Sequence, residues 1–294
     1  MLAIATVFTS VMYKPQPTAD GSVTFYSDTF GESFHSRYGA NQEAESKFVA
    51  PTQIARKATG KTLSLLDICY GLGYNSAVAL DTIWTVNPEC QVEWVGLELD
   101  RAVCEAAIEY NIFESRSSRV REIVSEIATG RPVNCDRFSG KLLLGDARET
   151  IATVLNSGFR AEAIFLDPFS PQRCPQLWTV EFLQQVANIL TPSGRLATYS
   201  CAAAVRSALQ LVGLNIGTIA PVGRRWPGTV ASFSSIDLPP LTEKERQHLQ
   251  TRAAIPYRDR TLRDDATTII KRRAEEVETS TLESTTQWKR RWPN

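Results

Sequence analysis

The sequence has few of the residues that bind transition metals. Its 294 residues include only two histidines, and its six cysteines lie far apart, with no C-x-x-C pair. A zinc site needs such residues at close spacing, so the inventory predicts no bound metal. Scattered, unpaired cysteines are typical of a reducing cytoplasm, which is the location that we expect.

Long apolar runs and an excess of either charge are also lacking. Residues 1–13 are mostly apolar and uncharged, but they lack the basic region and cleavage site of a signal peptide and are too short to span a bilayer. We expect a leading strand or a poorly ordered start, and no membrane partner. Lys plus Arg and Asp plus Glu both number 32, so a nucleic-acid partner would need a local basic patch.

The sequence does contain a strand, a glycine turn and a helical pattern in succession. Residues 63–68 form an apolar run, Gly71 and Gly73 follow, and residues 76–84 have apolar positions at helical spacing. This order begins a doubly wound nucleotide-binding sheet, in which glycine lets the backbone approach a ligand. Alone the motif is weak, because the third glycine of the GxGxxG pattern is absent.

Three later strand-like runs each lead to an acidic residue. The run at residues 92–97 ends at Glu98, which is placed to accept hydrogen bonds from ribose hydroxyls. Asp146 follows the third run, where a carboxylate can accept from an adenine amino group, and Asp167 follows the fourth. Each acid alone could cap a helix. Their shared position at the carboxyl ends of strands, where open α/β sheets bind ligands, predicts a site.

The chain divides into three expected regions. Residues 1–60 contain a hairpin with Asp20 and Gly21 in its turn, a polar segment from Gly31 that is either a lid or a surface loop, and a leading helix at 43–57. Residues 61–236 form the core. In residues 237–294 the apolar period fades, so this extension is expected to be partly helical or disordered.

Seven strand-like runs with helices between them predict an α/β fold. We expect a Rossmann-like class I S-adenosylmethionine methyltransferase, with a seven-stranded, mostly parallel sheet and helices on both faces. Hydride transfer is disfavoured, because no residue set suits a hydroxyl or carbonyl acid–base pair. Methyl transfer depends mainly on positioning. Asp167, stiffened by the proline-rich loop at 168–178, is the group expected to hold or deprotonate an acceptor amine.

The most specific pattern is Asp-Pro-Phe-Ser-Pro at 167–171, followed by Pro175 and Trp178. It resembles the fourth-strand motif of the MnmC proteins, whose methyltransferase half methylates the aminomethyl group of a modified wobble uridine in tRNA. Residues 69–75 are similar to their glycine turn, with Cys69 in place of a glycine, and residues 223–225 are similar to their basic turn. The resemblance implies a stand-alone methyltransferase without the FAD-dependent oxidase domain, acting on an aminomethyl uridine made elsewhere.

The same resemblance implies the cofactor, the partner and the residues of the site. S-adenosylmethionine is the expected cofactor, the anticodon region of tRNA the expected partner, and Asp167 the catalytic carboxylate. The implied cofactor-binding residues are Asp67, Tyr70, Gly71, Gly73, Asn75, Glu98, Asp146 and Ala147. The implied substrate-binding residues are Glu32, His35, Ser36, Phe169, Pro171, Trp178, Arg224 and Arg225.

Three other functions stay open. An amino methyltransferase acting on adenine in DNA or RNA has an Asp/Asn-Pro-Pro-Tyr/Phe motif, which residues 167–169 match in part. A polyamine synthase-like aminopropyltransferase uses the same sheet with a fourth-strand Asp. A cofactor-binding module without catalysis is the third, and the retained Asp167 argues against it.

A tRNA substrate also requires basic residues that meet its phosphates. The candidates are Arg173, Arg224, Arg225 and residues 271–273, although a solvated face or ion pairs are the expected state of the last group. Trp288 and Trp292 are able to stack on bases, but a frayed end is the expectation that we favour.

Overall fold

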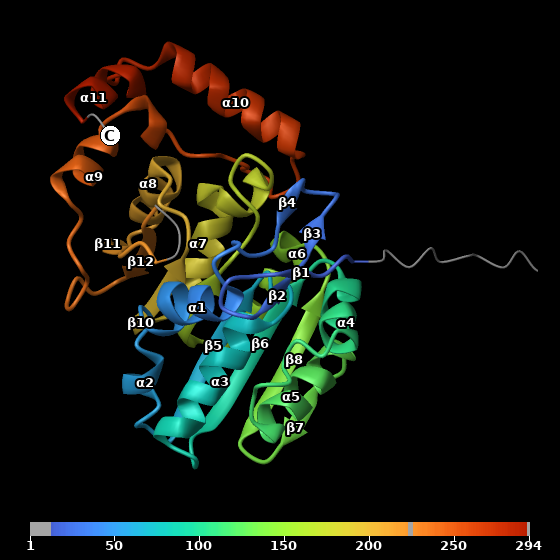
Figure 1. Cartoon of the computed structure of the whole chain (residues 1–294). Helices are drawn as coiled ribbons and strands as arrows, with labels where there is room; N and C mark the ends of the chain where they lie inside the picture. The colour runs from blue at the N-terminus through green and yellow to red at the C-terminus, as the bar shows by residue number, and fades with distance from the viewer. Residues whose placement is uncertain (1–12, 223–225, 293–294) are drawn as a thin grey trace, which may run out of the picture.

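The computed structural model describes residues 13–222 and 226–292, so the expectations for residues 1–12 and for the basic turn at 223–225 lie outside the described residues. An eight-stranded sheet forms its centre, in the order β11-β12-β10-β9-β5-β6-β8-β7 (Figure 1). Its strands are β5 (Thr62–Ile68), β6 (Gln91–Glu98), β7 (Val133–Cys135), β8 (Phe138–Leu144), β9 (Ala161–Leu166), β10 (Leu190–Thr198), β11 (Asn215–Ile219) and β12 (Gly228–Ser232).

The sheet is mostly parallel, as predicted. Strands β10, β9, β5, β6 and β8 pair in parallel, whereas β11, β12 and β7 pair antiparallel with their neighbours. The expected count of seven strands is wrong by one, because β7 was not foreseen. A two-residue turn at Asp136 and Arg137, with Arg137 at a φ of 64°, folds this short strand back on β8.

Helices cover both faces of the sheet, as predicted. On one face lie α3 (Tyr74–Val86), α4 (Arg101–Glu109) and α5 (Ser118–Ala128), and on the other lie α6 (Ala147–Asn156), α7 (Val180–Ile189) and α8 (Ala203–Leu211). This covering explains why β9 is apolar at all but one position, and why even the polar residues Ser64 and Asp67 of β5 are buried. Both are buried along nearly their whole length.

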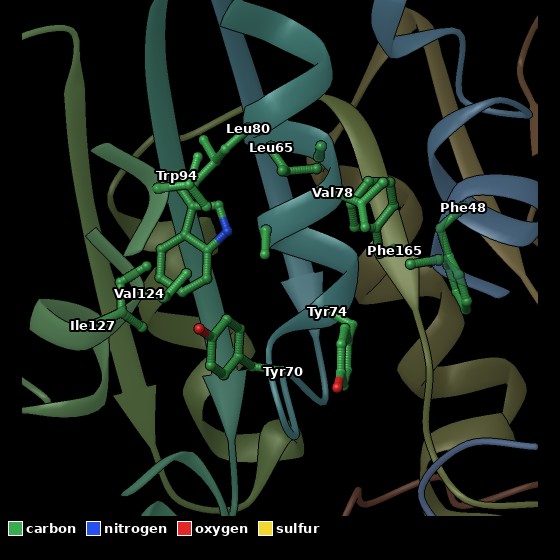
Figure 2. Close-up of a cluster of buried hydrophobic side chains, with 14 of the residues drawn as sticks. Phe48, Leu65, Tyr70, Tyr74, Val78, Leu80, Trp94, Val124, Ile127 and Phe165 are labelled. Carbon is green, nitrogen blue, oxygen red and sulfur yellow. The ribbon is translucent and has the colours of Figure 1, made fainter. Parts of the chain in front are cut away.

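The alternation of side chains along each strand divides the core into two apolar clusters. Leu65 of β5 and Trp94 of β6 are register partners, and both belong, with Val78 of α3, to the cluster drawn in Figure 2. The next register pair, Leu66 and Val95, faces the opposite cluster under α6, α7 and α8. Successive residues of a strand point to opposite faces, so the sheet separates the two clusters.

The N-terminal region packs against this core as two small hairpins and a broken helix. Asp20 lies in the turn of the first hairpin, where its carboxylate accepts hydrogen bonds from Thr18 and Ser22. The helix expected at 43–57 is interrupted around Pro51. The elements are β1 (Gln16–Pro17), β2 (Val23–Thr24), β3 (Tyr26–Ser27), β4 (Glu32–Ser33), α1 (Ala40–Ala44), the π-helical turn η1 (Glu45–Val49) and α2 (Ile54–Lys57).

The C-terminal extension is folded through residue 292. Figure 1 shows it in orange and red across one end of the molecule, formed by α9 (Glu243–His248), η3 (Arg252–Ala254), α10 (Ala266–Thr279) and α11 (Thr285–Arg291). Trp288 stacks on His248 with ring centroids 4.2 Å apart, so the expectation of a frayed end is wrong there. No described helix combines the length and the apolar character needed to cross a membrane.

The first testable prediction concerns Ser76, which links a buried acid to a buried indole. Its hydroxyl donates to Asp67 at 2.6 Å and accepts from the Trp94 indole at 2.8 Å, and all three side chains are buried. Ser76→Ala leaves both partners without this hydrogen bond, so the free energy of unfolding should fall by about 3 kcal/mol in urea titrations. Ser139→Ala, at an exposed hydroxyl, is the matched control, and an equal loss in both variants would contradict the prediction.

Candidate active site

A cavity lies at the carboxyl ends of the four central parallel strands. Gly71 follows β5, Glu98 ends β6, Asp146 follows β8 and Asp167 follows β9, and all four line the cavity. Parallel strands place their carboxyl ends at one edge, which is why residues from distant parts of the chain meet there. The position predicted for a site from the strand pattern is therefore the position of a cavity.

The turn after β5 has a strained backbone that glycine permits. Cys69, Gly71 and Gly73 all have positive φ angles, of 66°, 57° and 86°. At Gly73 a Cβ atom would lie 2.3 Å from the Tyr70 hydroxyl, so no larger residue fits without displacing that ring. The N–H groups of Cys69 and Tyr70 both donate to the Leu97 carbonyl, at 2.9 and 3.0 Å, which holds the turn across the end of β6. The backbone is thereby exposed to the cavity at Gly71.

Glu98 is a buried carboxylate held by three backbone N–H groups. One oxygen accepts from Gly71 at 2.7 Å, and the other accepts from Leu99 at 2.8 Å and from Asp100 at 3.0 Å. Burial raises the pKa of the Glu98 carboxyl group, while these backbone hydrogen bonds act in the opposite direction. The side chain thus joins the glycine turn to β6 and lines the cavity in a fixed orientation.

Asp146 caps the start of α6 and pairs with Arg148. Its carboxylate accepts from the Arg148 backbone N–H at 2.9 Å and from the guanidinium at 2.7 and 3.1 Å. Burial opposes ionisation of Asp146, but the hydrogen bonds and the charge of Arg148 outweigh it, so the pKa of the carboxyl group lies below its ordinary value. An ionised acceptor therefore stands at this side of the cavity.

Asp167 is oriented from the first turn of α3. Its carboxylate accepts from the Asn75 amide at 2.8 Å, and its backbone N–H donates to the Ile68 carbonyl at 3.1 Å. Asn75, predicted as a cofactor residue, does not line the cavity in the described structure. Its contact instead fixes the rotamer of Asp167.

Aromatic rings form the wall next to Asp167. Phe30 stacks on Phe169 with ring centroids 4.4 Å apart, and Phe34 meets the same ring edge-on at 5.1 Å. The Trp178 indole donates to the Phe169 carbonyl at 2.8 Å, and the Tyr199 hydroxyl donates to the Pro168 carbonyl at 2.9 Å. Trp178 is buried beneath the loop and supports it, whereas Tyr199 lines the cavity.

The polar segment after β3 lies against the cavity. Glu32 accepts from the backbone N–H and the hydroxyl of Ser170, at 3.1 and 2.5 Å, which joins the segment to the loop after β9. His35 lines the cavity with its Nδ1 atom 3.2 Å from the Thr24 hydroxyl. Ser36 does not line it, but its N–H donates to the carboxylate of Glu43, which does. In this structure the segment forms part of the cavity wall.

Most of the predicted residues meet in this cavity. Those that line it are Glu32, His35, Tyr70, Gly71, Glu98, Asp146, Ala147, Asp167 and Phe169. Those that the structure places outside its lining are Ser36, Asp67, Gly73, Asn75, Pro171 and Trp178. Arg224 and Arg225 lie outside the described residues.

The sequence interpretation missed several residues of the lining. Tyr199 directly follows β10, so the rule that identified Asp167 could also have identified Tyr199. Phe30, Phe34 and Glu43 precede the core and carry no periodic signal. Arg148 was also missed, because its role depends on partners far along the chain.

The basic candidates at residues 271–273 are partly occupied within the extension. Arg272 pairs with Asp264 at 2.7 Å, and Arg273 donates to the Ile255 carbonyl at 2.7 Å while lying over the ring of Tyr257. Arg173 is exposed and lies beside Gly31 in the segment that forms the cavity wall. Arg173 is therefore better placed than Arg272 and Arg273 to meet a ligand at the cavity.

The fold and a family model define the class of protein. A family described as S-adenosyl-L-methionine-dependent methyltransferase matches residues 111–234. The glycine turn and the acids at the ends of β6 and β8 suit the adenosine part of that cofactor, since they offer a close backbone and carboxylate acceptors for hydroxyl and amino groups. The chain is a class I S-adenosylmethionine-dependent methyltransferase, as expected.

Individual relatives give the family. The crystal structure of MnmC2 from Aquifex aeolicus is 35% identical, covers 92% of this chain and 86% of its own, and superposes with a TM-score of 0.80. An uncharacterised protein of Methanocaldococcus jannaschii is 30% identical over 271 residues, covering 89% of this chain and 71% of that protein. The chain belongs to the MnmC2 family of methyltransferases, which confirms the resemblance to the methyltransferase part of the MnmC proteins.

A longer relative matches over part of its length. The tRNA 5-methylaminomethyl-2-thiouridine biosynthesis bifunctional protein MnmC of Methylibium petroleiphilum is 28% identical over 244 residues. The match covers 77% of this chain but 37% of that protein. The chain thus spans little more than a third of the length of this bifunctional relative.

The second testable prediction concerns Asp67, which is fully buried under the glycine turn. Burial raises the pKa of its carboxyl group from 3.8 to about 7, against the hydrogen bond from Ser76, which lowers it. Between these two values the folded state holds a proton that the unfolded state has lost. The contribution of Asp67 to the free energy of unfolding therefore falls as the pH rises from about 4 to about 7.

Asp67→Asn should remove this pH dependence. The variant should have a higher melting temperature than the wild type at pH 8, and the difference should shrink as the pH is lowered to 5. Thermal unfolding at several pH values measures this, with Asp28→Asn, an exposed position, as the control. Parallel pH profiles of wild type and Asp67→Asn would refute the assignment.

Proposed function

We propose that this chain methylates the aminomethyl group on the modified wobble uridine of tRNA, using S-adenosylmethionine. The observation that carries the proposal is the carboxylate of Asp167, held by Asn75 beside the stacked rings of Phe30 and Phe169 in one cavity. Membership of the MnmC2 family supports it, as does the name of the bifunctional relative, which refers to methylaminomethyl-thiouridine biosynthesis in tRNA.

The cofactor side of the cavity is proposed to be the side formed by β5, β6 and β8. Glu98 would accept hydrogen bonds from the ribose hydroxyls, because it ends β6 with its carboxylate already oriented by backbone N–H groups. Asp146 would accept from the adenine amino group, and Ala147 beside it would contact the ring. Tyr70 and Gly71 would bring the turn against the rest of the cofactor.

The acceptor side is proposed to be formed by residues 30–35 and the loop after β9. An aminomethyl group is a cation at neutral pH. Besides Glu98 and Asp146 on the proposed cofactor side, the carboxylates of Glu32, Glu43 and Asp167 line the cavity. Carboxylates gathered in a partly enclosed space attract a cation. The rings of Phe30, Phe34 and Phe169 offer apolar surface on which a pyrimidine base can stack.

In this mechanism Asp167 prepares the acceptor amine. When bound, the cofactor supplies a methyl group whose bond to sulfur breaks with its electron pair staying on sulfur. The amine can form the new bond only after it loses a proton, because the ammonium ion has no lone pair. The carboxylate of Asp167 accepts a hydrogen bond from the amine and takes the proton directly or through water. Asn75 keeps the carboxylate in place, so orientation contributes to the rate.

The anticodon region of tRNA would approach over the segment at 30–35. Arg173 is exposed beside Gly31 and can meet a phosphate there. We also propose the cytoplasm, where tRNA is modified, as the place of action. The region boundaries at residues 60 and 236 are proposed as the limits of the methyltransferase core.

The third testable prediction is the substrate. Methyl transfer from labelled S-adenosylmethionine to total tRNA, isolated from cells that lack this activity, should place label in a methylaminomethyl uridine identified by nucleoside mass spectrometry. Label in adenine would instead favour the adenine amino methyltransferase. Transfer of an aminopropyl group from the decarboxylated cofactor to a diamine would favour the polyamine synthase. A chain that binds the cofactor and labels no nucleoside would be the binding module.

The fourth testable prediction is the role of Asp167. Asp167→Asn keeps the shape and the contact with Asn75 but removes the proton acceptor, so kcat should fall by about 100-fold or more. The Kd for S-adenosylmethionine should stay within about twofold, since the proposed cofactor contacts lie on other strands. Asp136→Asn, in the exposed turn between β7 and β8, is the matched control. Full turnover by Asp167→Asn would exclude this role.

A further inference from the structure

A chain of charged groups joins the C-terminal extension to the cavity. The guanidinium of Arg148 donates to Asp146 at 2.7 Å on one side and to Asp259 at 3.1 Å on the other, and it also donates to the Asp264 carbonyl at 2.8 Å. The Arg148 side chain is 12% exposed and that of Asp259 is 0% exposed. Arg148 therefore connects a carboxylate that lines the cavity to a buried carboxylate 111 residues away in sequence.

Asp259 is held firmly by its own surroundings. Its carboxylate accepts from the backbone N–H groups of Arg263 and Asp264, both at 3.2 Å. The backbone N–H of Asp259 donates to the carboxylate of Glu181 on α7 at 2.8 Å. The guanidinium of Arg258 donates to the other oxygen of Glu181, also at 2.8 Å. The residue is thus fixed both to the loop that follows it and to the core.

We propose that Asp259 is a positioning residue for the cofactor pocket, acting through Arg148 on Asp146. The inference rests on the proposed contact between Asp146 and the adenine amino group. The Asp146 side chain is 36% exposed and lines the cavity. The backbone N–H of Arg148 binds one of its oxygens, and the guanidinium is what binds the second oxygen as well. The planar fork of Arg148 binds both carboxylates at once and so fixes the direction in which Asp146 can accept a hydrogen bond.

Stability alone does not account for this arrangement. Removing charges from water is costly, and apolar side chains of similar size often replace a buried ion pair without loss of stability. A chain of groups that ends on a cavity carboxylate has a geometric use that an apolar cluster lacks. The extension therefore completes the pocket from outside the sheet instead of only covering the core.

The fifth testable prediction measures recognition of the adenine amino group directly. Calorimetric titration gives the Kd of S-adenosylhomocysteine and of S-inosylhomocysteine, in which a carbonyl replaces that amino group. The wild type should prefer the adenine compound by about tenfold or more, because in the other ligand a carbonyl oxygen, which cannot donate a hydrogen bond, faces the carboxylate of Asp146. In Asp259→Asn this preference should fall below about threefold, mainly through weaker binding of S-adenosylhomocysteine.

Two further variants separate positioning from folding. Arg148→Lys keeps a cation beside Asp259 but cannot bind both carboxylates with a fork, so it should lose the preference even if Asp259→Asn does not fold. Glu181→Gln loosens the attachment of the extension but leaves the contact between Asp259 and Arg148, so it should keep the preference. Asp265→Asn, at the exposed start of α10, controls for the loss of one charge. Thermal unfolding without ligand verifies that each variant is folded.

The outcomes are distinct. Equal weakening of both ligands in Asp259→Asn would mean a structural role only and would overturn the inference, as would an unchanged preference. A wild type with no preference would refute the contact of Asp146 with adenine and the inference with it. Neither result depends on tRNA, so failure of the proposed methyl transfer to tRNA would be seen separately.

Discussion

The buried carboxylate of Glu98 is the constraint on which the rest of the site depends. A carboxylate without hydrogen bonds is costly to bury. The carboxylate of Glu98 accepts hydrogen bonds from the backbone N–H groups of Gly71, Leu99 and Asp100. The glycine turn must keep its positive φ angles for that contact to form. The same turn starts α3, whose first turn carries Asn75, and Asn75 holds Asp167. The position of Glu98 at the end of β6 thus affects, through the turn and α3, the orientation of Asp167, the acid proposed to accept the proton.

The parts of the fold that follow from local patterns were predictable from the sequence. Apolar runs gave the central strands, and the acids after them gave the edge of the sheet where the cavity lies. Strand β7 was not predictable, because it has three residues after Pro132 and its pairing depends on a tight turn at Asp136. The fold of the extension was hard to foresee for a different reason. Its buried residues, such as Trp288, are few and pack on side chains distant in sequence.

For the site as well, local patterns in the sequence predicted some residues, and contacts between distant segments determined others. The resemblance implied Asp67 as a cofactor residue, but Asp67 lies inside β5 and donates no group to the cavity, since its carboxylate accepts from Ser76 of α3. Glu98 and Asp167, by contrast, stand at or beyond the end of their strands. Position relative to the strand end therefore distinguishes a cavity residue from a core residue. Phe30 and Arg148 have partners about 100 residues away or more, and no spacing in the sequence could have indicated them.

The N-terminal segment and the C-terminal extension both contact side chains that line the cavity at the edge of the sheet. Asp146 and Asp167 stand beyond the ends of β8 and β9, so contacts from other elements help to fix the directions of their carboxylates. On the proposed acceptor side the N-terminal segment packs against the loop after β9 through Glu32 and Ser170. On the proposed cofactor side the extension reaches Asp146 through Asp259 and Arg148. A methyl transfer that depends on alignment requires both reactants to be held, and in the proposed function each of these two segments orients one of them.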